Sequence, residues 1–268
     1  MTPPIILSIA GSDCSGGAGI QADIKTISAL GGYAASVITA ITVQNTLGVQ
    51  AVHPLPASIV RAQIEAVLDD LHPKAIKIGM VHNADLVHVI ADCISTYHPE
   101  FVVYDPVMIS TSGRRLMTEE TIQTIKEKLF PLCTLLTPNL SEASLLYGCP
   151  ISTTTEMEQA AQELSHLYHT SILIKGGHLE GNEMCDILCN QASTACTLYA
   201  HPKIDSHNLH GTGCTLSSAI ATYLAYNNCL EKAVSLAKAY INTAISNGKN
   251  LQIGNGNGPL WHFPLPEP

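Results

Sequence analysis

The chain opens on an apolar run, IILSIA at 5–10, continues through the glycine-rich GSDCSGGAG at 11–19, and enters the segment IQADIKTISAL at 20–30. A short apolar run is typical of a buried strand. The glycines allow a tight turn, and the segment after them is typical of a helix. The stretch therefore predicts a strand, a glycine-rich turn and a helix, which is the repeating unit of parallel α/β sheets.

The same alternation recurs along the chain. Further apolar runs that predict buried strands are Ser36–Val43, Ala75–Ile78, Phe101–Tyr104, Thr134–Leu136 and Ser171–Ile174. Segments with apolar residues three and four apart, which predict helices, are Ile59–Leu71, Thr118–Leu129 and Glu156–Tyr168. Thr118 and the acids after it are typical of a helix start. With no Pro/Ser-rich linker and no internal repeat, we expect one domain over 1–268, a mostly parallel sheet with helices on both faces.

Composition narrows the class of partner. Of 268 residues, 46% are hydrophobic and 13% are charged, a balance typical of an ordered globular protein. The formal charge of −9 leaves no basic stripe for nucleic acid or an anionic membrane, and no stretch reaches the roughly 18 apolar residues of a membrane span. Any phosphate must therefore be bound locally, by backbone amides and one or two lysines.

The cysteines and the first residues indicate a compartment. Nine cysteines are scattered, odd in number and without a CxxC pair or zinc spacing. The start, MTPPIILSIA, lacks the basic beginning and long apolar core of a secretion signal. We therefore expect a protein of the reducing cytoplasm without a disulfide framework.

The loop at 11–19 permits three interpretations. A Walker A loop requires Lys and Ser/Thr after its second glycine, but Gly16 is followed by Gly17 and Ala18, which excludes it. The order Gly17-Ala-Gly19-Ile-Gln-Ala matches a dinucleotide fingerprint, but the acid expected about 20 residues on is absent, and Gln44 stands there. A plain tight turn before a helix is the third interpretation.

A second glycine motif is NLHGTGCT at 208–215, followed by a predicted helix at 216–226. Gly211 and Gly213 with Thr212 at a helix start predict a nest of amides that binds anions. Cys214 at this place is expected to have a lowered pKa and is a candidate base or polar partner. A simple capped helix with a buried cysteine is the alternative.

Oxygen-bearing side chains follow two predicted strands. Asn139 and Glu142, in TPNLSE at 137–142, lie three apart on one helical face, and Asp105 ends another strand. Magnesium needs only one or two protein oxygens, so these residues are candidate metal ligands. A helix start with an acid in its first turn explains Asn139 and Glu142 equally.

Lys175 ends a predicted strand in ILIKGGH at 172–178, before two glycines. A lysine at the carboxyl end of a strand can reach the phosphates of a nucleotide, because ligands of open parallel sheets collect at that edge. Otherwise it is a solvated charge.

Taken together, these motifs resemble a known family. The segments are, in order, AGIQADIK at 18–25, QNT at 44–46, KIGM at 77–80, DPVM at 105–108, TPN at 137–139, KGGH at 175–178, HGTGC at 210–214 and GNGNGP at 254–259. This order is similar to that of the hydroxymethylpyrimidine and phosphomethylpyrimidine kinases of thiamine synthesis, and it spans nearly the whole chain.

The resemblance implies a ribokinase-like three-layer αβα sandwich, a homodimer, that uses ATP and Mg²⁺ to phosphorylate 4-amino-5-hydroxymethyl-2-methylpyrimidine and then its monophosphate. It places Glu142, with Asp105 nearby, at the magnesium. Lys175, Thr212 and Asn139 are expected at the nucleotide, and Gly211 to Cys214 at the anion hole, with Cys214 where ribokinase relatives carry a catalytic aspartate. The residues implied for the pyrimidine pocket are Gln44, Asp23, Gly11, Val43, Met80 and Val107.

Two positions depart from the family pattern. Ser141 stands where proline is common, and Leu209 replaces a small hydroxyl residue before His210, which removes one possible phosphate contact. The nearest competing function is a pyridoxal or pyridoxine kinase of the same fold, and Gln44 favours the pyrimidine. A nicotinamide-dependent dehydrogenase and a non-catalytic vitamin-binding protein are more distant alternatives.

Overall fold

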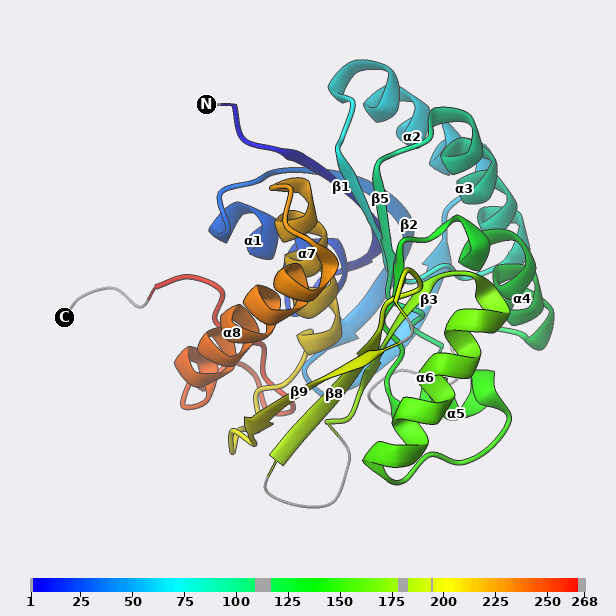
Figure 1. Ribbon diagram of the computed structural model, residues 1–268. Helices are drawn as coiled ribbons and strands as arrows, with labels where there is room; N and C mark the ends of the chain where they lie inside the picture. Colours follow the sequence, from blue (N-terminus) through cyan, green and yellow to red (C-terminus); the bar gives the residue numbers. More distant parts are fainter. Residues whose placement is uncertain (1, 109–116, 178–182, 194, 265–268) are drawn as a thin grey trace.

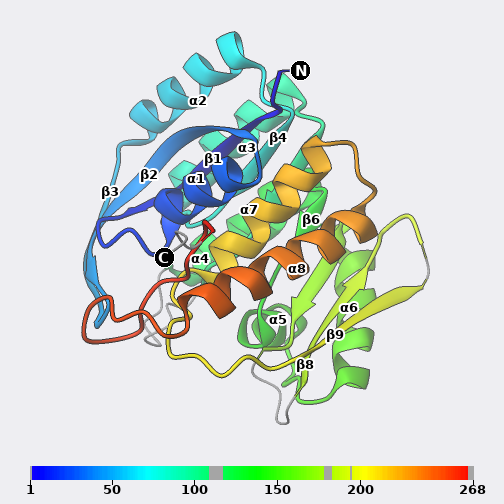
Figure 2. The ribbon, with the colours of Figure 1, turned by 90° about the vertical axis from the view of Figure 1, so that its left-hand side faces the viewer.

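The computed structural model describes residues 2–108, 117–177, 183–193 and 195–264. A twisted sheet lies between two layers of helices, and the view turned by 90° shows α1, α7 and α8 together in front of it (Figures 1 and 2). This is the mostly parallel αβα sandwich that the alternation predicts, so that prediction is confirmed.

Within the described residues the sheet has nine strands in the order β3-β2-β1-β4-β5-β6-β7-β8-β9. Strands β2, β1, β4, β5, β6 and β7 pair in parallel, whereas β3, β8 and β9 join antiparallel at the two edges. The strands are β1 (Ile5–Asp13), β2 (Tyr33–Asn45), β3 (Gly48–Pro54), β4 (Ala75–Ile78), β5 (Phe101–Tyr104), β6 (Leu135–Leu136), β7 (Ser171–Lys175), β8 (Glu183–Cys189) and β9 (Cys196–Pro202).

Helices cover both faces because the buried strands alternate their apolar side chains between two cores. Leu7 and Ile9 of β1 pack into one cluster, and Ile6 packs into the other. The helices on the first side are α2 (Ala57–Leu71), α3 (Ala84–Tyr97), α4 (Glu119–Thr124), α5 (Leu140–Tyr147) and α6 (Thr154–Tyr168); those on the second are α1 (Gly19–Ala29), α7 (Thr212–Ala225) and α8 (Leu230–Gly248).

The central strands lie where the sequence predicts them, and Ala75–Ile78 and Phe101–Tyr104 match residue for residue. Thr118 is an N-cap, since its side chain accepts a hydrogen bond from the N–H of Thr121. The predicted helix there is nevertheless divided, because α4 gives way to a π-helical turn at Ile125–Leu129 before a short 3-10 turn at Phe130–Leu132. The antiparallel edge strands are not among the predicted runs, because their exposed faces interrupt the apolar pattern.

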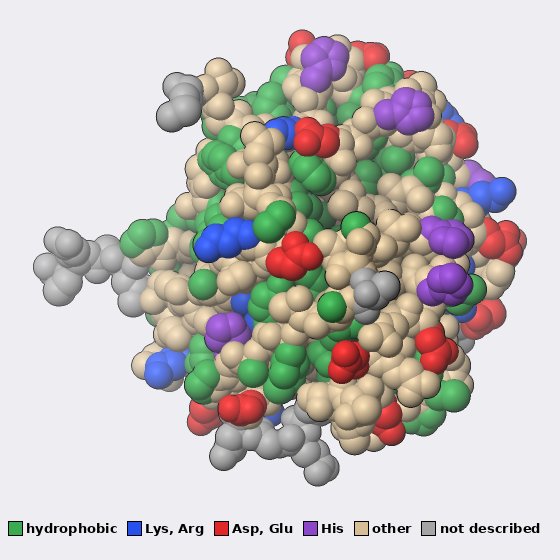
Figure 3. Space-filling view, viewed as in Figure 1, with side chains coloured by type: hydrophobic (Ala, Val, Ile, Leu, Met, Phe, Trp, Pro, Cys, Tyr) green, Lys and Arg blue, Asp and Glu red, His purple; other side chains and the backbone are tan. Residues whose placement is uncertain are grey.

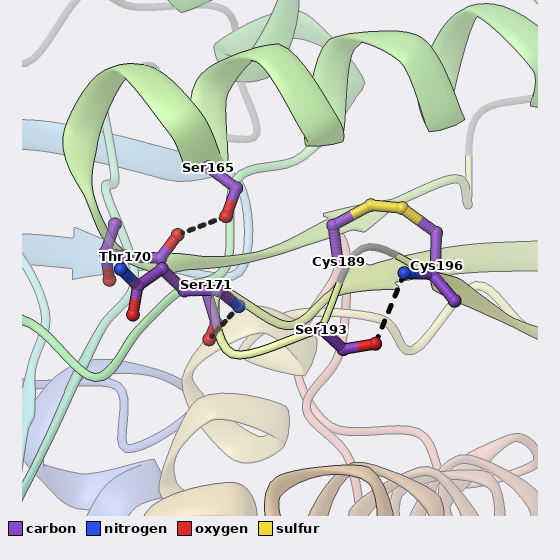
Figure 4. Close-up of a disulfide and its surroundings, with 8 residues drawn as sticks. Ser165, Thr170, Ser171, Cys189, Ser193 and Cys196 are labelled. Atoms are coloured by element: carbon purple, nitrogen blue, oxygen red, sulfur yellow. Dashed lines mark hydrogen bonds between the residues drawn. A yellow bond between two sulfur atoms is a disulfide. The ribbon is translucent and has the colours of Figure 1, made fainter.

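Two cysteines form a disulfide, although the scattered cysteines predicted a reducing compartment without a disulfide framework. Cys189 ends β8 and Cys196 begins β9, and the two residues are direct partners in the antiparallel ladder (Figure 4). A hairpin brings them together, a proximity that residue spacing alone did not reveal. The cross-link joins neighbouring strands at one edge, while Cys14, Cys93 and Cys214 are among the cysteines that stay free.

The surface shows no large patch of one charge on the face seen in Figure 3, where acidic, basic and apolar side chains are interspersed. No helix in the described part of the chain is long and apolar enough to cross a membrane.

Candidate active site

A cavity of about 400 Å³ lies at the carboxyl ends of the parallel strands, where the first turns of α1, α5 and α7 converge. Its wall combines residues from segments that are far apart in the sequence. The predicted site residues that line it are Gly11, Gln44, Met80, Asp105, Val107, Asn139, Glu142, Lys175, Gly211, Thr212, Gly213 and Cys214. The structure therefore brings twelve of the fourteen predicted residues to one place.

Lys175 and Asp105 form an ion pair in the cavity wall. Lys175 ends β7, Asp105 follows β5, and the Nζ to Oδ1 distance is 2.6 Å. Thr137 also donates to that oxygen over 3.0 Å. Burial lowers the pKa of Lys175, but Asp105 and Glu142 outweigh it, so the pKa lies above its ordinary value and the ammonium stays charged. The ammonium of Lys175 therefore lies at the edge of the cavity, with Asp105 as its counter-ion.

Glu142 is part of a capping box at the start of α5. The Asn139 side chain accepts from the N–H of Glu142 over 2.9 Å, and Glu142 Oε2 accepts from the N–H of Asn139 over 2.9 Å. Oε1 faces the N–H of Met108 at 3.3 Å. The helix-start interpretation is therefore correct, and it leaves room for a second role because each carboxylate oxygen carries a further lone pair.

Burial also changes the protonation of Glu142. It raises the pKa of this carboxyl to about 7, with Asp105 adding to the rise and Lys175 opposing it. Glu142 is thus influenced by the Asp105 carboxylate and by the Lys175 ammonium in opposite directions. A cation bound in the cavity would lower its pKa and favour the charged carboxylate.

Glycines shape the start of α7. Gly211, the N-cap, has a φ of 90°, and a Cβ there would lie 1.9 Å from the carbonyl oxygen of Gly17. A Cβ on Gly213 would lie 2.9 Å from Asp105 Oδ2 and 3.4 Å from Lys175 Nζ. Glycine is therefore required where the charged pair approaches the positive end of the helix.

The expected lowering of the Cys214 pKa is wrong for this structure. Cys214 keeps some exposure to the cavity, yet burial of its thiol raises the pKa to about 11, against the opposing effect of Lys77. Asp23 and Asp105 add to the rise because they disfavour a further negative charge. Near neutral pH the residue is a thiol, not a thiolate.

The other end of the cavity is formed by Gly11, Gln44, Met80 and Val107. Gly11 is packed against Met80, since a Cβ on Gly11 would lie 2.7 Å from the Met80 Cε. Gln44 follows a register shift in the pairing of β2 with β3, and such a bulge redirects a side chain.

Two predicted pocket residues lie elsewhere. Val43 points to the outer side of β2 and is 52% exposed, because successive residues of a strand face opposite sides. Asp23 is fully buried, and its carboxylate accepts from Ser8, Lys77 and Ser218 at 2.5–2.8 Å. Asp23 fastens α1 to the sheet and is absent from the cavity wall.

The structure also adds residues that sequence reasoning missed. Asp13 and His210 lie in the wall beside Gln44, and Asp186 pairs with Lys238 over 2.5 Å farther along it. Asp13 and His210 fall inside the two quoted glycine motifs, so the signal was present but was attributed to the glycines. Asp186 belongs to the unpredicted β8 and had no such signal. His178 of the fourth motif lies outside the described residues.

Comparison with known proteins identifies the family. The model of the family described as phosphomethylpyrimidine kinase matches residues 13–261. The hydroxymethylpyrimidine/phosphomethylpyrimidine kinase of Rhizobium meliloti is 50% identical over 97% of both chains.

Two solved structures extend the comparison. The phosphomethylpyrimidine kinase of Clostridium difficile is 44% identical over 90% of this chain and 99% of that one, with a TM-score of 0.80. The Bacillus subtilis pyridoxal kinase, solved as an ADP complex, is 33% identical over 97% and 98%, with a TM-score of 0.89. Since the family model and a relative of 50% identity both span most of its length, the chain belongs to the phosphomethylpyrimidine kinase family.

Proposed function

We propose that this enzyme uses ATP and Mg²⁺ to phosphorylate 4-amino-5-hydroxymethyl-2-methylpyrimidine and then its monophosphate, as a step of thiamine synthesis. The carrying observation is that one cavity joins Gln44 at one end to Lys175, Asp105 and the start of α7 at the other. The names of the relatives, which are kinases of these two pyrimidines, support the same assignment.

The charged end suits phosphoryl transfer. That reaction has a loose transition state, so the protein contributes mainly positioning and charge stabilisation. Lys175 is the phosphate-contacting cation, and the first-turn N–H groups of Gly213 and Cys214 form the anion hole. No side chain of the described residues caps this helix start, and of its first N–H groups only that of Thr212 has a backbone acceptor outside the helix, the Leu209 carbonyl at 3.3 Å. The N–H groups of Gly213 and Cys214 are therefore the ones available to a ligand. The ADP complex of the Bacillus subtilis pyridoxal kinase supports a nucleotide in a cavity of this fold.

Asp105 and Glu142 suit magnesium, which prefers oxygen ligands and takes only one or two carboxylates beside nucleotide phosphates. Oδ2 of Asp105 faces the start of α7, as the 2.9 Å approach to a Cβ on Gly213 shows. The ion supplies charge neutralisation of the phosphate oxygens. Asn139 then acts indirectly, because its hydrogen bonds hold Glu142 in place.

The neutral thiol of Cys214 supports membership of the anion hole over the role of base. Its place in the first turn of α7 allows a polar contact to the reacting hydroxyl without removal of the proton beforehand.

The other end suits the pyrimidine. A primary amide such as Gln44 accepts from an exocyclic amine and donates to the adjacent ring nitrogen. Gly11, Met80 and Val107 form the pocket wall beside it. Asp23 and Val43 are no longer part of the proposed pocket, since neither reaches the cavity.

A kinetic assay tests the assignment. ATP consumption is measured with hydroxymethylpyrimidine, with its monophosphate and with pyridoxal, each with and without Mg²⁺. We expect turnover of both pyrimidines and loss of both activities without the ion. If the alcohol is consumed and the monophosphate is not, the two-step assignment is wrong.

Pyridoxal kinase is the second candidate, favoured by the close structural likeness to the Bacillus subtilis pyridoxal kinase. A higher kcat/KM for pyridoxal than for hydroxymethylpyrimidine in the same assay would establish it.

A homodimer and a cytoplasmic location complete the proposal. Both rest on the resemblance to the family. Light scattering on the purified chain measures its mass in solution, and a mass near 28.5 kDa would exclude the dimer.

A further inference from the structure

The side chains of Asp13, His210 and Gln44 form a partly buried hydrogen-bonded network next to the cavity. His210 Nε2 lies 2.8 Å from Asp13 Oδ2 and 2.9 Å from Nε2 of the Gln44 side-chain amide. Asp13 ends β1, Gln44 lies near the end of β2 and His210 precedes α7, so three distant segments meet here. His210 and Asp13 are both at least nine-tenths buried, at 9% and 3% exposed.

Asp13 is held as a carboxylate. Burial raises its pKa, but hydrogen bonds from His210, Ser15 and Ala18 outweigh that effect and bring the pKa to about 2. Oδ1 accepts from the Ser15 N–H and hydroxyl, and Oδ2 accepts from the N–H groups of Gly17 and Ala18. Asp13 therefore only accepts at neutral pH.

An ionised oxygen at 2.8 Å determines the state of His210. Two acceptors at that distance repel, so Nε2 must carry the proton and donate it to Asp13. The ring packs directly against Gly17, since a Cβ built on that glycine would lie only 2.3 Å from the His210 Cδ2. The backbone of His210 is also tied to Gly258, whose carbonyl accepts its N–H over 3.1 Å.

This proton determines the orientation of Gln44. The structure places Gln44 Nε2 at this position, 2.9 Å from His210 Nε2. A nitrogen that donates cannot also accept from an amide NH₂, so the amide is assigned the other way round, with its oxygen facing His210 and sharing the single Nε2 proton with Asp13 Oδ2. The oxygen and nitrogen of a primary amide have nearly the same shape, and their partners decide which way the group is turned. The backbone of Gln44 is held too, since its carbonyl accepts from the Cys14 thiol over 3.1 Å.

We propose that His210, anchored on Asp13, is a positioning residue that locks the Gln44 amide with its oxygen toward the imidazole and its NH₂ presented to the cavity in a set order. The second lone pair of that oxygen and one N–H then read an amine next to a ring nitrogen. A free amide turns its two ends with similar ease, so the lock selects for the aminopyrimidine edge. The identity of the substrate rests on the proposed function, whereas the hydrogen-bonded network of Asp13, His210 and Gln44 is present without substrate.

The first test observes the proton directly. Long-range ¹⁵N–¹H spectra of the full chain, without substrate, report which imidazole nitrogen of each histidine is protonated. The chain has 12 histidines, so the His210 signals are assigned by their loss in His210→Phe. We expect a protonated Nε2. A neutral ring with a bare Nε2 would overturn the proposal whatever the enzyme phosphorylates.

The second test compares two substitutions. His210→Phe keeps the ring shape and removes the donor, whereas His210→Gln keeps an N–H at similar reach. The loss of one hydrogen bond is expected to raise KM for hydroxymethylpyrimidine roughly 3- to 10-fold in His210→Phe. It should raise KM more than it lowers kcat, and His210→Gln should recover most of the loss.

Pyridoxal separates positioning from general damage, because it has no amine beside a ring nitrogen. Because His210 lines the cavity for either compound, the KM for pyridoxal, or its dissociation constant if it is not turned over, should rise clearly less in His210→Phe than the KM for hydroxymethylpyrimidine. Equal losses for both compounds, or no recovery in His210→Gln, would overturn the positioning role. Wild-type protein inactive on the pyrimidine would defeat the proposed function instead, and the tautomer measurement would still stand.

Discussion

The pairs Lys77–Asp23 and Lys175–Asp105 both lie near the carboxyl ends of the parallel strands, but of these two only the second lines the cavity. Lys77 of β4 pairs with Asp23 over 2.8 Å, and both side chains are fully buried. Lys175 of β7 pairs with Asp105 over 2.6 Å, but 16% of the lysine side chain is exposed toward the cavity.

Their partners explain the difference. Ser8 and Ser218 complete the hydrogen bonding of Asp23, which joins β1, α1 and α7 around Lys77. The pair of Lys175 instead abuts Gly213 and shares the cavity with Glu142. The Lys77–Asp23 pair thus stabilises the core, whereas the Lys175–Asp105 pair leaves the lysine ammonium partly accessible to a ligand.

The largest expected effect is on stability, at the fully buried pair of Lys77 and Asp23. Lys77→Met leaves Asp23 as a buried charge without its cation, which should lower the free energy of unfolding by about 3–5 kcal/mol. Urea denaturation followed by circular dichroism measures it. The double variant Lys77→Met/Asp23→Leu should recover part of the loss because it removes both charges, and an equal loss in the double variant would assign the effect to packing.

At the pair of Lys175 and Asp105, which lines the cavity, a substitution should affect catalysis. Lys175→Met removes a cation from the phosphate site and should reduce kcat on the order of 10²–10³-fold, by analogy with the loss of one transition-state donor. Its free energy of unfolding should change less than in Lys77→Met, because water in the cavity can solvate Asp105. A variant that is as unstable as Lys77→Met and keeps its kcat would show that the two pairs are alike.

Glu142, near Lys175 and Asp105, should make the free energy of unfolding depend on pH. Its pKa is about 7 in the folded chain against an ordinary 4.5, so the native state binds more protons between these values. The stability that Glu142 contributes is therefore fully present below pH 4.5 and is lost as the pH rises through 7. Without Mg²⁺ and nucleotide, wild type should lose on the order of 2–3 kcal/mol more than Glu142→Gln between pH 5 and 8. Parallel pH curves for the two proteins would contradict this.

The smallest effect is expected at Cys214, whose thiol interacts electrostatically with Lys77, Asp23 and Asp105. Because its thiol is neutral near pH 7, Cys214→Ala should reduce kcat by less than about tenfold, below the 10²–10⁴-fold typical of a lost general base. The pH profile of kcat, recorded for wild type and variant, should keep its acidic limb. Disappearance of that limb together with a loss above 10²-fold would restore the thiolate as base.

Much of the architecture follows from local pattern. Ala75–Ile78 and Phe101–Tyr104 are buried on both faces, so their apolar runs are continuous and visible. The strands β3, β8 and β9 have exposed positions and escaped prediction. The disulfide between Cys189 and Cys196 escaped for the same reason, because it depends on the β8–β9 pairing.

The sequence by itself determined the fold class, the family resemblance and most of the cavity wall, because strand ends and glycine turns are encoded by neighbouring residues. Only the tertiary structure decided that Asp23 belongs to the core, that Val43 faces outward and that Cys214 keeps its proton. It also decided that His210 and Asp13 stand behind Gln44. Each of these depends on burial and on partners 15 to 197 residues away, and no local pattern carries that information.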